Sequence, residues 1–535
     1  MDLEHSILYY GDNLDVLRRH VDDESVDLVY LDPPFNSNQD YNVLFAEKNG
    51  AQSTAQIQAF EDTWHWDQRA AYAYQEAVES GGQVAQAMVA FRQLLGDSDM
   101  MAYLAMMAPR IVDLHRVLKD DGSIYVHCDT TASHYLKVLL DSVFGPKRFR
   151  NEIIWKRTSG HSDARRYGRV HDTVLYFAKG DSPKWNQIYQ PYEQAYVDQY
   201  YRYMDPDGRR FMSDNLSASG LQGGGYEYEW KGIERVWRCP FETMKELDKQ
   251  GRIFYTRNGI PRRKRYLDEA KGLPIQDVWT DLEALRSWHG ERLGYPTQKP
   301  ESLLERIILA SSDEGDVVLD PFCGCGTTIS VAQKLNRRWI GIDITYLAIT
   351  LIRHRLTDIF GPAAKFDVMG EPVTASEAQE LATEDPYQFQ WWALGLVNAR
   401  PAEGKKGADR GIDGRLYFHD EGAKGTTKQV IFSVKAGKTG SPHVRDLRGV
   451  IEREKATIGV LISMQEPTAQ MRKEAANAGF YQSPWGKHAR IQLLTIAELL
   501  DGRRVDMPAT AGVNVTFKRA PKAQATKAKD PKLFD

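Results

Sequence analysis

The sequence predicts an α/β protein in which helices cover both faces of a parallel sheet. Residues 7–12 and 26–32 are short apolar runs with the composition of buried strands, and the helical stretch 13–21 separates them. The alternation continues through residues 123–145 and returns at residues 301–344. Strands that alternate with helices are typical of parallel sheets, because a parallel neighbour requires a crossover connection.

The individual elements follow from periodicity and from stop signals. In the first third, a long helical pattern ends near residue 119, where Asp-Asp-Gly stops the helix. A strand is predicted at residues 123–129 and a helix at residues 132–145. After the middle of the chain, the predicted elements are helix 301–312, strand 316–322, helix 327–336 and strand 338–344.

The middle of the chain, residues 155–290, loses this alternation and is rich in Tyr, Trp, Arg and Gly. We therefore predict that it is inserted into one α/β domain, whose two parts are residues 1–154 and 291–357. The remaining predicted segments are a linker at 358–385, a second α/β domain at 386–508 and a disordered basic tail at 509–535. The strand candidates of the second domain are residues 415–421, 428–437, 457–463 and 490–496.

The composition is that of an ordinary globular protein. Hydrophobic residues make up 42% of the 535 residues and charged residues 27%. No apolar run reaches about 18 residues, so we expect no membrane span, and the first residues lack the pattern of a signal peptide. Four cysteines are too few for a disulfide framework, so a reducing, cytoplasmic location is expected.

The net charge is −4, yet basic residues are concentrated in two stretches. Such a local excess can form a phosphate-binding face, or it can be a solvated surface with acidic partners, and charge alone does not decide between them. The basic residues are Lys147, Arg148, Arg150, Lys156, Arg157, Arg165, Arg166 and Arg169 in the first stretch, and Arg257, Arg262, Arg263, Lys264 and Arg265 in the second.

A strand, a glycine-rich turn and a helix follow one another in VVLDPFCGCGTTISVAQKL. Gly324 and Gly326 allow positive φ and close approach of a ligand to the backbone, and Thr327 and Thr328 can cap the helix. The next strand ends in Asp343, where a carboxylate can accept hydrogen bonds from both ribose hydroxyls of a nucleoside.

The turn matches neither G-x-G-x-x-G nor a phosphate-binding P-loop, so a cofactor without pyrophosphate fits better. The alternative is a tight turn that binds nothing. Cys323 and Cys325 could suggest a metal pair, but no second Cys/His pair lies near enough in sequence to complete a tetrahedral zinc site. We therefore interpret both cysteines as small fillers of the turn.

An Asp-Pro-Pro-Phe tetrapeptide follows the strand at 26–32. The prolines remove two N–H donors and leave carbonyl acceptors, Asp32 adds a carboxylate, and Phe35 adds a flat apolar face. Such a set can hold an amino group on an aromatic ring. A structural proline turn with a capping aspartate is the alternative, and the tetrapeptide by itself favours it.

The two motifs together resemble the β group of DNA amino-methyltransferases. The resemblance covers about residues 6–356 and includes ILYYGDNLDVL and GYPTQKPESLLERIILASSDEGDVVLDPFCGCGTT. It implies a Rossmann-like fold that binds S-adenosylmethionine, with residues 155–290 as the target-recognition region. Adenine enzymes of the group usually have Asp at the first position of the tetrapeptide and cytosine-N4 enzymes more often have Ser, so adenine N6 is favoured.

The resemblance also implies a mechanism, in which the target base is flipped out of the duplex. Asp32 and the Pro33 carbonyl would accept hydrogen bonds from the amine, Phe35 would stack on the ring, and the methyl group would pass in line from sulfur to nitrogen. The implied catalytic residues are Asp32, Pro33, Pro34 and Phe35. The implied cofactor residues are Asp12, Thr297, Gln298, Lys299, Asp320, Phe322, Gly324, Gly326, Thr327, Thr328 and Asp343.

Near the C-terminus, GADRGIDGRLYF and VIFSVKAGK resemble the Mrr-like branch of the PD-(D/E)XK nucleases. Asp413 and Lys435 match that pattern and imply a Mg²⁺ site at Asp413, whereas Ser433 stands where an acid or Gln is expected. An upstream Glu is also missing, with Gln388 and Gln390 as the nearest candidates. Fewer carboxylates weaken metal binding, so a degenerate DNA-binding module is the alternative to a nuclease.

Arg445 and Arg448 lie on the helical stretch 444–454 and are either phosphate contacts or ordinary exposed arginines. Double-stranded DNA is the expected partner, and a second copy of the chain and the subunits of a restriction or defence system are further candidates. Two rival functions are a DNA-binding scaffold with degenerate enzymatic modules and an enzyme that acts on RNA.

Overall fold

A computed structural model describes residues 5–34, 66–160, 165, 167–218, 225–286, 288–293, 295, 297–402, 411–419 and 427–508. The chain divides into two compact units. One unit is the inserted segment Gln187–Gln276, and the other contains the segments before and after it. No helix among these residues is long and apolar enough to cross a membrane.

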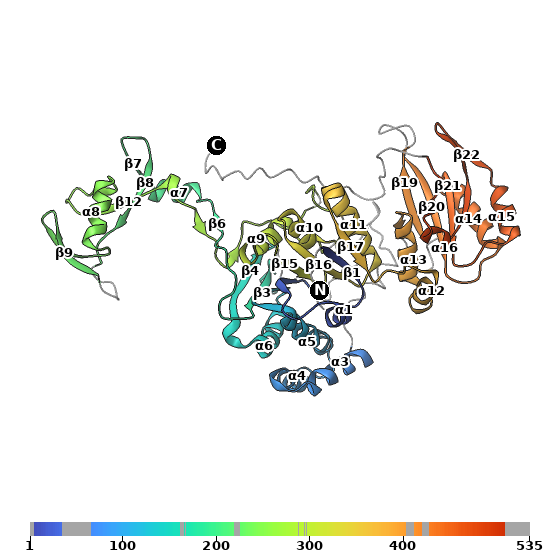
Figure 1. The fold of residues 1–535 in the computed structure, drawn as a ribbon, viewed down its shortest axis with the longest axis horizontal. Coiled ribbons are helices and arrows are strands. Elements are labelled where there is room, and N and C mark those ends of the chain that lie inside the picture. The colour runs from blue at the N-terminus through green and yellow to red at the C-terminus, as the bar shows by residue number, and fades with distance from the viewer. Residues whose placement is uncertain are drawn as a thin grey trace. The chain divides into compact units, whose positions relative to one another are not determined.

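Within the described residues, nine strands form one sheet in the order β14-β4-β5-β3-β2-β15-β16-β1-β17 (Figure 1). All neighbours from β3 to β17 are parallel, as expected. The strands are β1 Ser6–Tyr10, β2 Val26–Leu31, β3 Leu118–Cys128, β4 Phe149–Lys156, β5 His171–Ala178, β14 Val278–Trp279, β15 Val317–Asp320, β16 Arg338–Asp343 and β17 Phe366–Met369.

The prediction of a wholly parallel sheet is wrong at one edge. β5 runs antiparallel to both β3 and β4. Antiparallel neighbours need no crossover helix, and the described residues between Lys156 and His171 form none. The alternation of strands and helices therefore did not predict the reversed strand.

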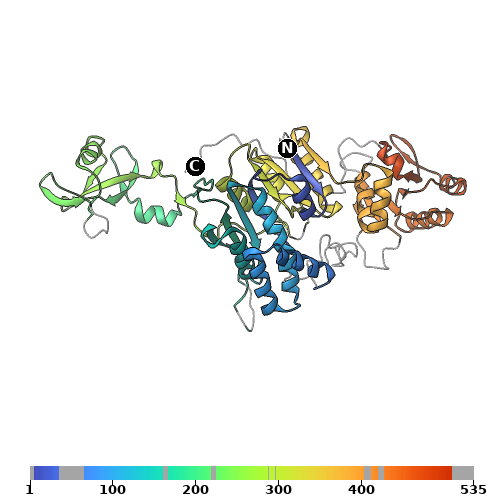
Figure 2. The ribbon, with the colours of Figure 1, turned by 60° about the horizontal axis from the view of Figure 1, so that its bottom comes forward.

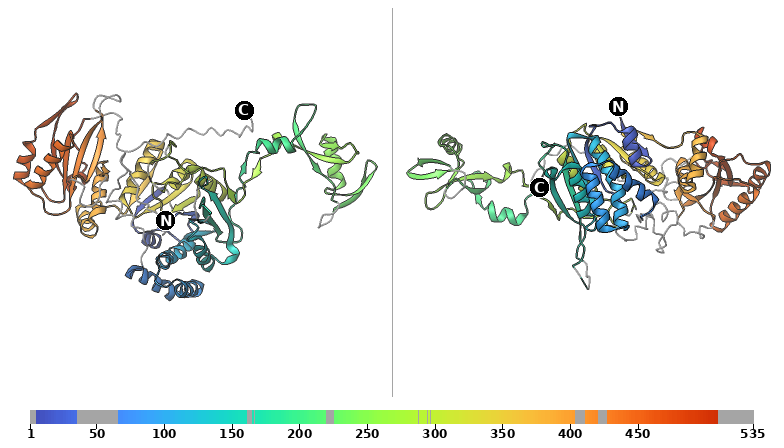
Figure 3. Two further views of the ribbon diagram at one scale, coloured as in Figure 1. Left: turned by 180° about the vertical axis from the view of Figure 1, so that it is seen from behind. Right: turned by 90° about the horizontal axis from the view of Figure 1, so that it is seen from below.

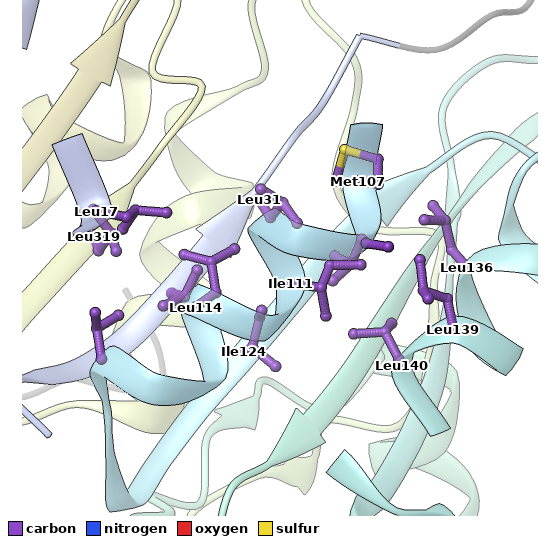
Figure 4. Packing of buried hydrophobic residues seen from close by; sticks show 14 of the residues in the cluster. Leu17, Leu31, Met107, Ile111, Leu114, Ile124, Leu136, Leu139, Leu140 and Leu319 are labelled. Atoms are coloured by element: carbon purple, nitrogen blue, oxygen red, sulfur yellow. The ribbon is translucent and has the colours of Figure 1, made fainter. Parts of the chain in front are cut away.

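Helices cover both faces of the sheet, as predicted (Figure 3). The helices on one face are α1 Asn13–His20, α4 Gly82–Leu95, α5 Asp99–Val117 and α6 Ser133–Phe144, with α3 Gln68–Glu79 packed on α5; those on the other are α9 Glu301–Ser311, α10 Thr327–Lys334 and α11 Tyr346–Phe360. Figure 4 shows Ile111 and Leu114 of α5 among Leu31 and Ile124 of the sheet. Each such buried side chain contributes about 1.5–3 kcal/mol.

In its described residues the inserted unit has small antiparallel sheets, two α-helices and a short 3-10 helix at Leu267–Glu269 (Figure 2). It is narrower than the predicted insertion 155–290, because β5 and β14 belong to the main sheet. Trp230, Trp237 and Met244 form its apolar centre. Its elements are β6 Tyr189–Gln190, α7 Gln194–Tyr200, β7 Tyr203–Met204, β8 Arg210–Asn215, β9 Tyr226–Trp230, β10 Ile233–Trp237, α8 Phe241–Lys249, β11 Ile253–Tyr255, β12 Pro261–Tyr266 and β13 Leu273–Pro274.

The C-terminal domain contains a five-stranded sheet in the described residues, in the order β18-β19-β20-β21-β24. The four strands predicted for it are confirmed, as is the helix at 444–454. Its elements are α13 Pro386–Leu396, β18 Arg400–Pro401, β19 Gly414–Phe418, β20 Lys428–Lys435, α14 Ser441–Arg453, β21 Ile458–Ser463, α15 Ala469–Ala476, β22 Phe480–Ser483, β23 Gly486–Ala489, β24 Ile491–Thr495 and α16 Ile496–Leu500.

The prediction of a linker at 358–385 is wrong. β17 pairs in parallel with β1 and extends the main sheet, and a helix, α12 Ala375–Glu384, follows it. Thr374 and Glu377 form a capping box at the start of α12, a signature present in the sequence. The predicted basic tail, 509–535, lies outside the described residues.

Candidate active site at the carboxyl ends of three strands

Three neighbouring parallel strands end at the same edge of the sheet, and each ends in an aspartate. β15 pairs with β2 on one side and with β16 on the other. Asp32 directly follows β2, Asp320 is the last residue of β15, and Asp343 is the last residue of β16. The Asp-Pro-Pro turn and the glycine-rich turn are therefore neighbours in space, as the predicted site requires. Ligands of open α/β sheets bind at this kind of edge.

Asp32 forms an ion pair with Lys299. The Lys299 Nζ lies 2.5 Å from Asp32 Oδ2, and the two side chains are only 13% and 18% exposed. The pair joins positions 267 residues apart in the chain. Pro33 is buried and Pro34 is half-buried beside it. Phe35 lies outside the described residues, so its stacking role stays a prediction.

Lys299 belongs to a loop that its neighbour Gln298 holds in place. The Gln298 side chain is buried, donates to the carbonyl of Glu291 at 2.8 Å and accepts from the N–H of Leu293 at 2.8 Å. Thr297 is exposed, and its carbonyl accepts from Lys299 Nζ at 3.5 Å. Gln298 thus fixes the loop that carries Lys299, while contacts of these residues with a cofactor stay predictions.

The glycine-rich turn has the predicted left-handed backbone, with φ of 51° at Gly324 and 72° at Gly326. A Cβ at Gly326 would lie 2.7 Å from the Ile352 side chain, so packing against α11 requires this glycine even before any ligand is considered. Cys323 and Cys325 are buried within the turn, as expected for fillers. Among the described residues, no three His, Cys, Asp or Glu side chains are placed to hold a metal ion.

The Asp343 carboxylate faces this turn. Oδ2 accepts from the N–H of Gly324 at 2.9 Å, and Oδ1 accepts from the N–H and the hydroxyl of Thr345 at 2.9 and 2.8 Å. The Ile344 N–H also contributes to the stabilisation of this carboxylate, which therefore lies among donors from the turn and from the start of α11. Burial raises the pKa of Asp343 to about 6.

Asp320 is buried between the two other aspartates. Burial, together with the charges of Asp32 and Asp343, raises its pKa to about 7, against hydrogen bonds from the Thr328 hydroxyl and the Phe322 N–H that lower it. A positively charged ligand at this strand edge would favour the ionised form of Asp320.

The prediction that Thr327 and Thr328 cap the helix is wrong. The N-cap of α10 is Gly326, in the left-handed conformation and without a side-chain cap. Both threonines are instead inside the first turn, where their hydroxyls serve other segments. Thr328 bonds to Asp320, and Thr327 accepts from Arg355 at 3.1 Å.

Asp12 caps α1 and binds Arg110. Its Oδ1 accepts from the N–H of Leu14 at 2.8 Å, and the Arg110 Nη2 lies 2.9 Å from both carboxylate oxygens. The adjacent Asn13 donates to the carbonyl of Pro321 at 2.8 Å, which fastens this segment to the loop after β15. These contacts place Asp12 near the predicted cofactor loop; a direct cofactor contact stays a prediction.

A buried polar chain at the same edge was not predicted. The Tyr30 hydroxyl lies 2.9 Å from His127 Nδ1, and His127 Nε2 lies 3.3 Å from Asp172. Burial raises the pKa of Asp172, but His127 and Arg157 outweigh this effect and hold it below its usual value. Tyr30 precedes Asp32 by two residues and so shares its side of β2. The available signal was a histidine inside an apolar strand pattern.

The C-terminal candidate site has one carboxylate in the part of the chain that the structure describes. Asp413 Oδ2 accepts from the N–H of Val434 at 2.7 Å and from Lys435 Nζ at 3.3 Å, with Ser433 buried beside them. Gln390 reaches only the Asp413 carbonyl, at 3.4 Å, and the Gln388 side chain accepts from the N–H of Tyr346 instead. Because Mg²⁺ prefers several oxygen ligands, this donor set does not fit the ion.

Four of the clustered basic residues have acidic partners among the described residues. Lys264 and Arg265 of the inserted unit pair with Asp205 and Asp214. Arg265 is 56% exposed and agrees with the solvated-surface interpretation, whereas Lys264 is only 14% exposed and belongs to the interior of the unit. In the first stretch Arg148 pairs with Asp181 and Arg157 with Asp172, and on α14 Arg445 pairs with Glu474 and Arg448 with Glu452.

Two family models match this chain, one over the main α/β domain and one over the C-terminal domain. A family model described as DNA methylase matches residues 26–353, and one described as NACHT-associated inactive restriction endonuclease 1 matches residues 388–501. The match at 388–501 confirms the predicted resemblance of the C-terminal domain to restriction endonucleases.

Curated relatives include two restriction-modification proteins. The type II methyltransferase M.EcaI of Enterobacter cloacae is 35% identical over 262 residues, which are 48% of this chain and 57% of that protein. The StyLTI type III Mod subunit of Salmonella typhimurium is 28% identical over 386 residues, 69% of this chain and 55% of that protein. The chain thus matches little more than half the length of either relative.

Among solved structures, the PvuII cytosine-N4-specific DNA methyltransferase is 15% identical, with a TM-score of 0.31. The alignment covers 69% of this chain and 96% of that one.

Proposed function

Because the chain belongs to the DNA methylase family, we propose that it methylates the exocyclic amine of a base in double-stranded DNA. The observation that carries this proposal is the meeting of the Asp-Pro-Pro turn and the glycine-rich turn on the adjacent strands β2 and β15. A base amine at one turn and a methyl donor at the other would then lie within one site.

S-adenosylmethionine is the proposed cofactor, and it supplies a methyl group on a positively charged sulfur. Asp343 would bind a ribose hydroxyl, since its carboxylate lies at the glycine-rich turn beside Gly324 and Thr345. Asp320 lies at the same edge, and a positively charged sulfonium beside it would favour the ionised carboxylate over the neutral form that burial favours. The turn has no lysine to neutralise a pyrophosphate, in keeping with a nucleoside cofactor that has no phosphate.

The chain's own residues would orient the amine of a flipped base. Asp32 is an acceptor for an N–H of the amine, and Lys299 holds its carboxylate in one orientation. When the N–H groups of the amine donate hydrogen bonds to such acceptors, electron density shifts back onto the nitrogen, and the nitrogen becomes a better nucleophile. Most of the rate enhancement would come from this positioning.

We propose adenine N6 as the acceptor, on the strength of the aspartate at position 32; cytosine N4 is the second candidate. Purified protein, tritiated S-adenosylmethionine and DNA from a host without methyltransferases test the proposal. We expect tritium in N6-methyladenine after digestion to nucleosides. Tritium in N4-methylcytosine would reassign the base, label in RNA in preference to DNA would reassign the substrate, and no incorporation would refute the function.

We also propose that the inserted unit contacts the target DNA and that the chain works within a restriction or defence system. Arg257 and Arg263 lie on the exposed surface of the unit and are candidates for phosphate contacts. The partnership rests on similarity to a type III Mod subunit. Copurification of a restriction subunit with the tagged chain from its host would support it.

For the C-terminal domain we propose DNA binding without cleavage, because Asp413 is paired with Lys435 and lacks carboxylate partners among the described residues. Supercoiled plasmid mixed with the protein and Mg²⁺ is expected to stay supercoiled. Nicking that needs Mg²⁺ and disappears in both Asp413→Ala and Lys435→Ala, with methylation unchanged, would establish a nuclease instead.

A further inference from the structure

Arg355 is a buried arginine that faces the glycine-rich turn from α11. Its side chain is 1% exposed. Ile352, one helical turn earlier on the same face, packs against Gly326. The helix therefore meets the turn with one apolar and one charged side chain.

The Arg355 guanidinium contacts two segments of the chain at once. Nη1 donates to the carbonyl of Cys325 at 3.2 Å and to the hydroxyl of Thr327 at 3.1 Å. Nη2 donates to Glu301 Oε1 at 2.9 Å. The left-handed Gly326 stands between Cys325 and Thr327, so both acceptors on that side belong to the turn itself.

Glu301 connects this arginine to the opposite half of the site. It is the first residue of α9 and lies two residues after Lys299, which pairs with Asp32. Contacts thus run from the turn through Arg355 and Glu301 to the segment that carries Lys299, and from there to Asp32. The two ends of this path are the proposed cofactor loop and the proposed base-holding aspartate.

A contribution to the stability of the fold is by itself a weak explanation for a charged arginine that is 1% exposed. Replacing a buried ion pair with apolar side chains of similar size is often neutral or stabilising, because desolvation offsets the Coulomb attraction. An apolar residue could fill the space, but the planar guanidinium fixes three acceptors in defined directions.

We propose that Arg355 and Glu301 are positioning residues that couple the cofactor turn to the Asp32–Lys299 pair. The inference rests on the proposed methyltransferase function. Arg355 sets the shape of the turn, and Glu301 transmits that shape to the segment of Lys299. Loss of Arg355 should therefore affect both cofactor binding and turnover, whereas loss of Glu301 should affect mainly turnover.

Variants of the full chain test this division, with S-adenosylmethionine affinity from calorimetry and turnover on unmethylated plasmid DNA. Arg355→Met is expected to weaken cofactor binding about tenfold and to lower kcat about a hundredfold, since small misplacements of reacting groups have effects of this size. Glu301→Ala is expected to lower kcat about tenfold with Kd nearly unchanged. Glu301→Gln, which keeps an oxygen toward Arg355, should recover most of kcat.

Arg353→Met is the matched control, because Arg353 lies on the same helix and pairs with Glu371 away from the turn. Thermal unfolding midpoints identify variants that are merely unstable. If Arg355→Met is unstable, the variants of Glu301, whose side chain is partly exposed, still test the inference. If the wild type is active and the variants of Arg355 and Glu301 behave like Arg353→Met, the inference is wrong and the proposed function still stands. A wild type that neither binds the cofactor nor methylates DNA would overturn the proposed function and the inference together.

Discussion

Replacement of Asp32 by alanine is expected to abolish methyl transfer while S-adenosylmethionine still binds. The carboxylate is the acceptor proposed for the base amine, and it is also the partner of Lys299 at 2.5 Å. Its loss removes the hydrogen bond to the base amine that we expect to strengthen most in the transition state. It also leaves the Lys299 ammonium, which is only 13% exposed, without its carboxylate partner. We expect kcat to fall about a thousandfold, measured by tritium transfer to DNA.

Asp23→Ala is a suitable control for Asp32→Ala. Asp23 lies before the other end of β2, is 71% exposed and pairs with Arg116 at the surface. This variant should methylate DNA at the wild-type rate. If Asp32→Ala did the same, Asp32 could not be the group that holds the amine, and the site would have to be placed elsewhere.

Replacement of Asp343 by alanine is expected to have its largest effect on cofactor affinity. The carboxylate is the proposed ribose acceptor and also orders the turn through Gly324 and the start of α11 through Thr345. Hydrogen bonds to charged groups contribute about 1.5–3 kcal/mol, so Kd for S-adenosylmethionine should rise about a hundredfold in calorimetry. Asp367→Ala, on the exposed side of β17, should bind like the wild type.

The same carboxyl group predicts a pH dependence. Burial raises the pKa of Asp343 to about 6, so the group is mostly ionised at pH 7 and becomes protonated as the pH falls toward 5. A protonated carboxyl is a poorer acceptor, and cofactor affinity should therefore weaken over this interval. Asp343→Asn removes the contribution of this group and should reduce the change between pH 7 and 5, while Asp320, whose pKa of about 7 lies at the edge of the interval, still titrates. A wild-type affinity that is constant from pH 7 to 5, or an unchanged Kd in Asp343→Ala, would contradict the ribose assignment.

Local patterns in the sequence predicted much of the architecture. Strands such as 26–32 and 338–344 are short, apolar and bounded by polar residues, so their identity depends little on distant partners. Positive φ at Gly324 and Gly326 also followed from residue type, because only glycine adopts it without steric cost.

The errors lie where pairing between distant segments decides the structure. Residues 366–369 are too few to show a clear strand period, and they become β17 only because β1 offers an edge to pair with. The direction of β5 depends in the same way on its neighbours in the sheet. Thr327 and Thr328 are residue types that often cap helices, but their hydroxyls form hydrogen bonds with residues distant in the sequence instead, such as Arg355 with Thr327.

Residue types and their order were enough to indicate which strand ends hold Asp32 and Asp343, since a strand and the turn that follows it are local. Folding alone decided that Lys299 meets Asp32 across 267 residues and that Arg355 joins the glycine-rich turn to Glu301. A charged side chain takes its role from the partner that burial brings to it, and no pattern along the chain specifies that partner.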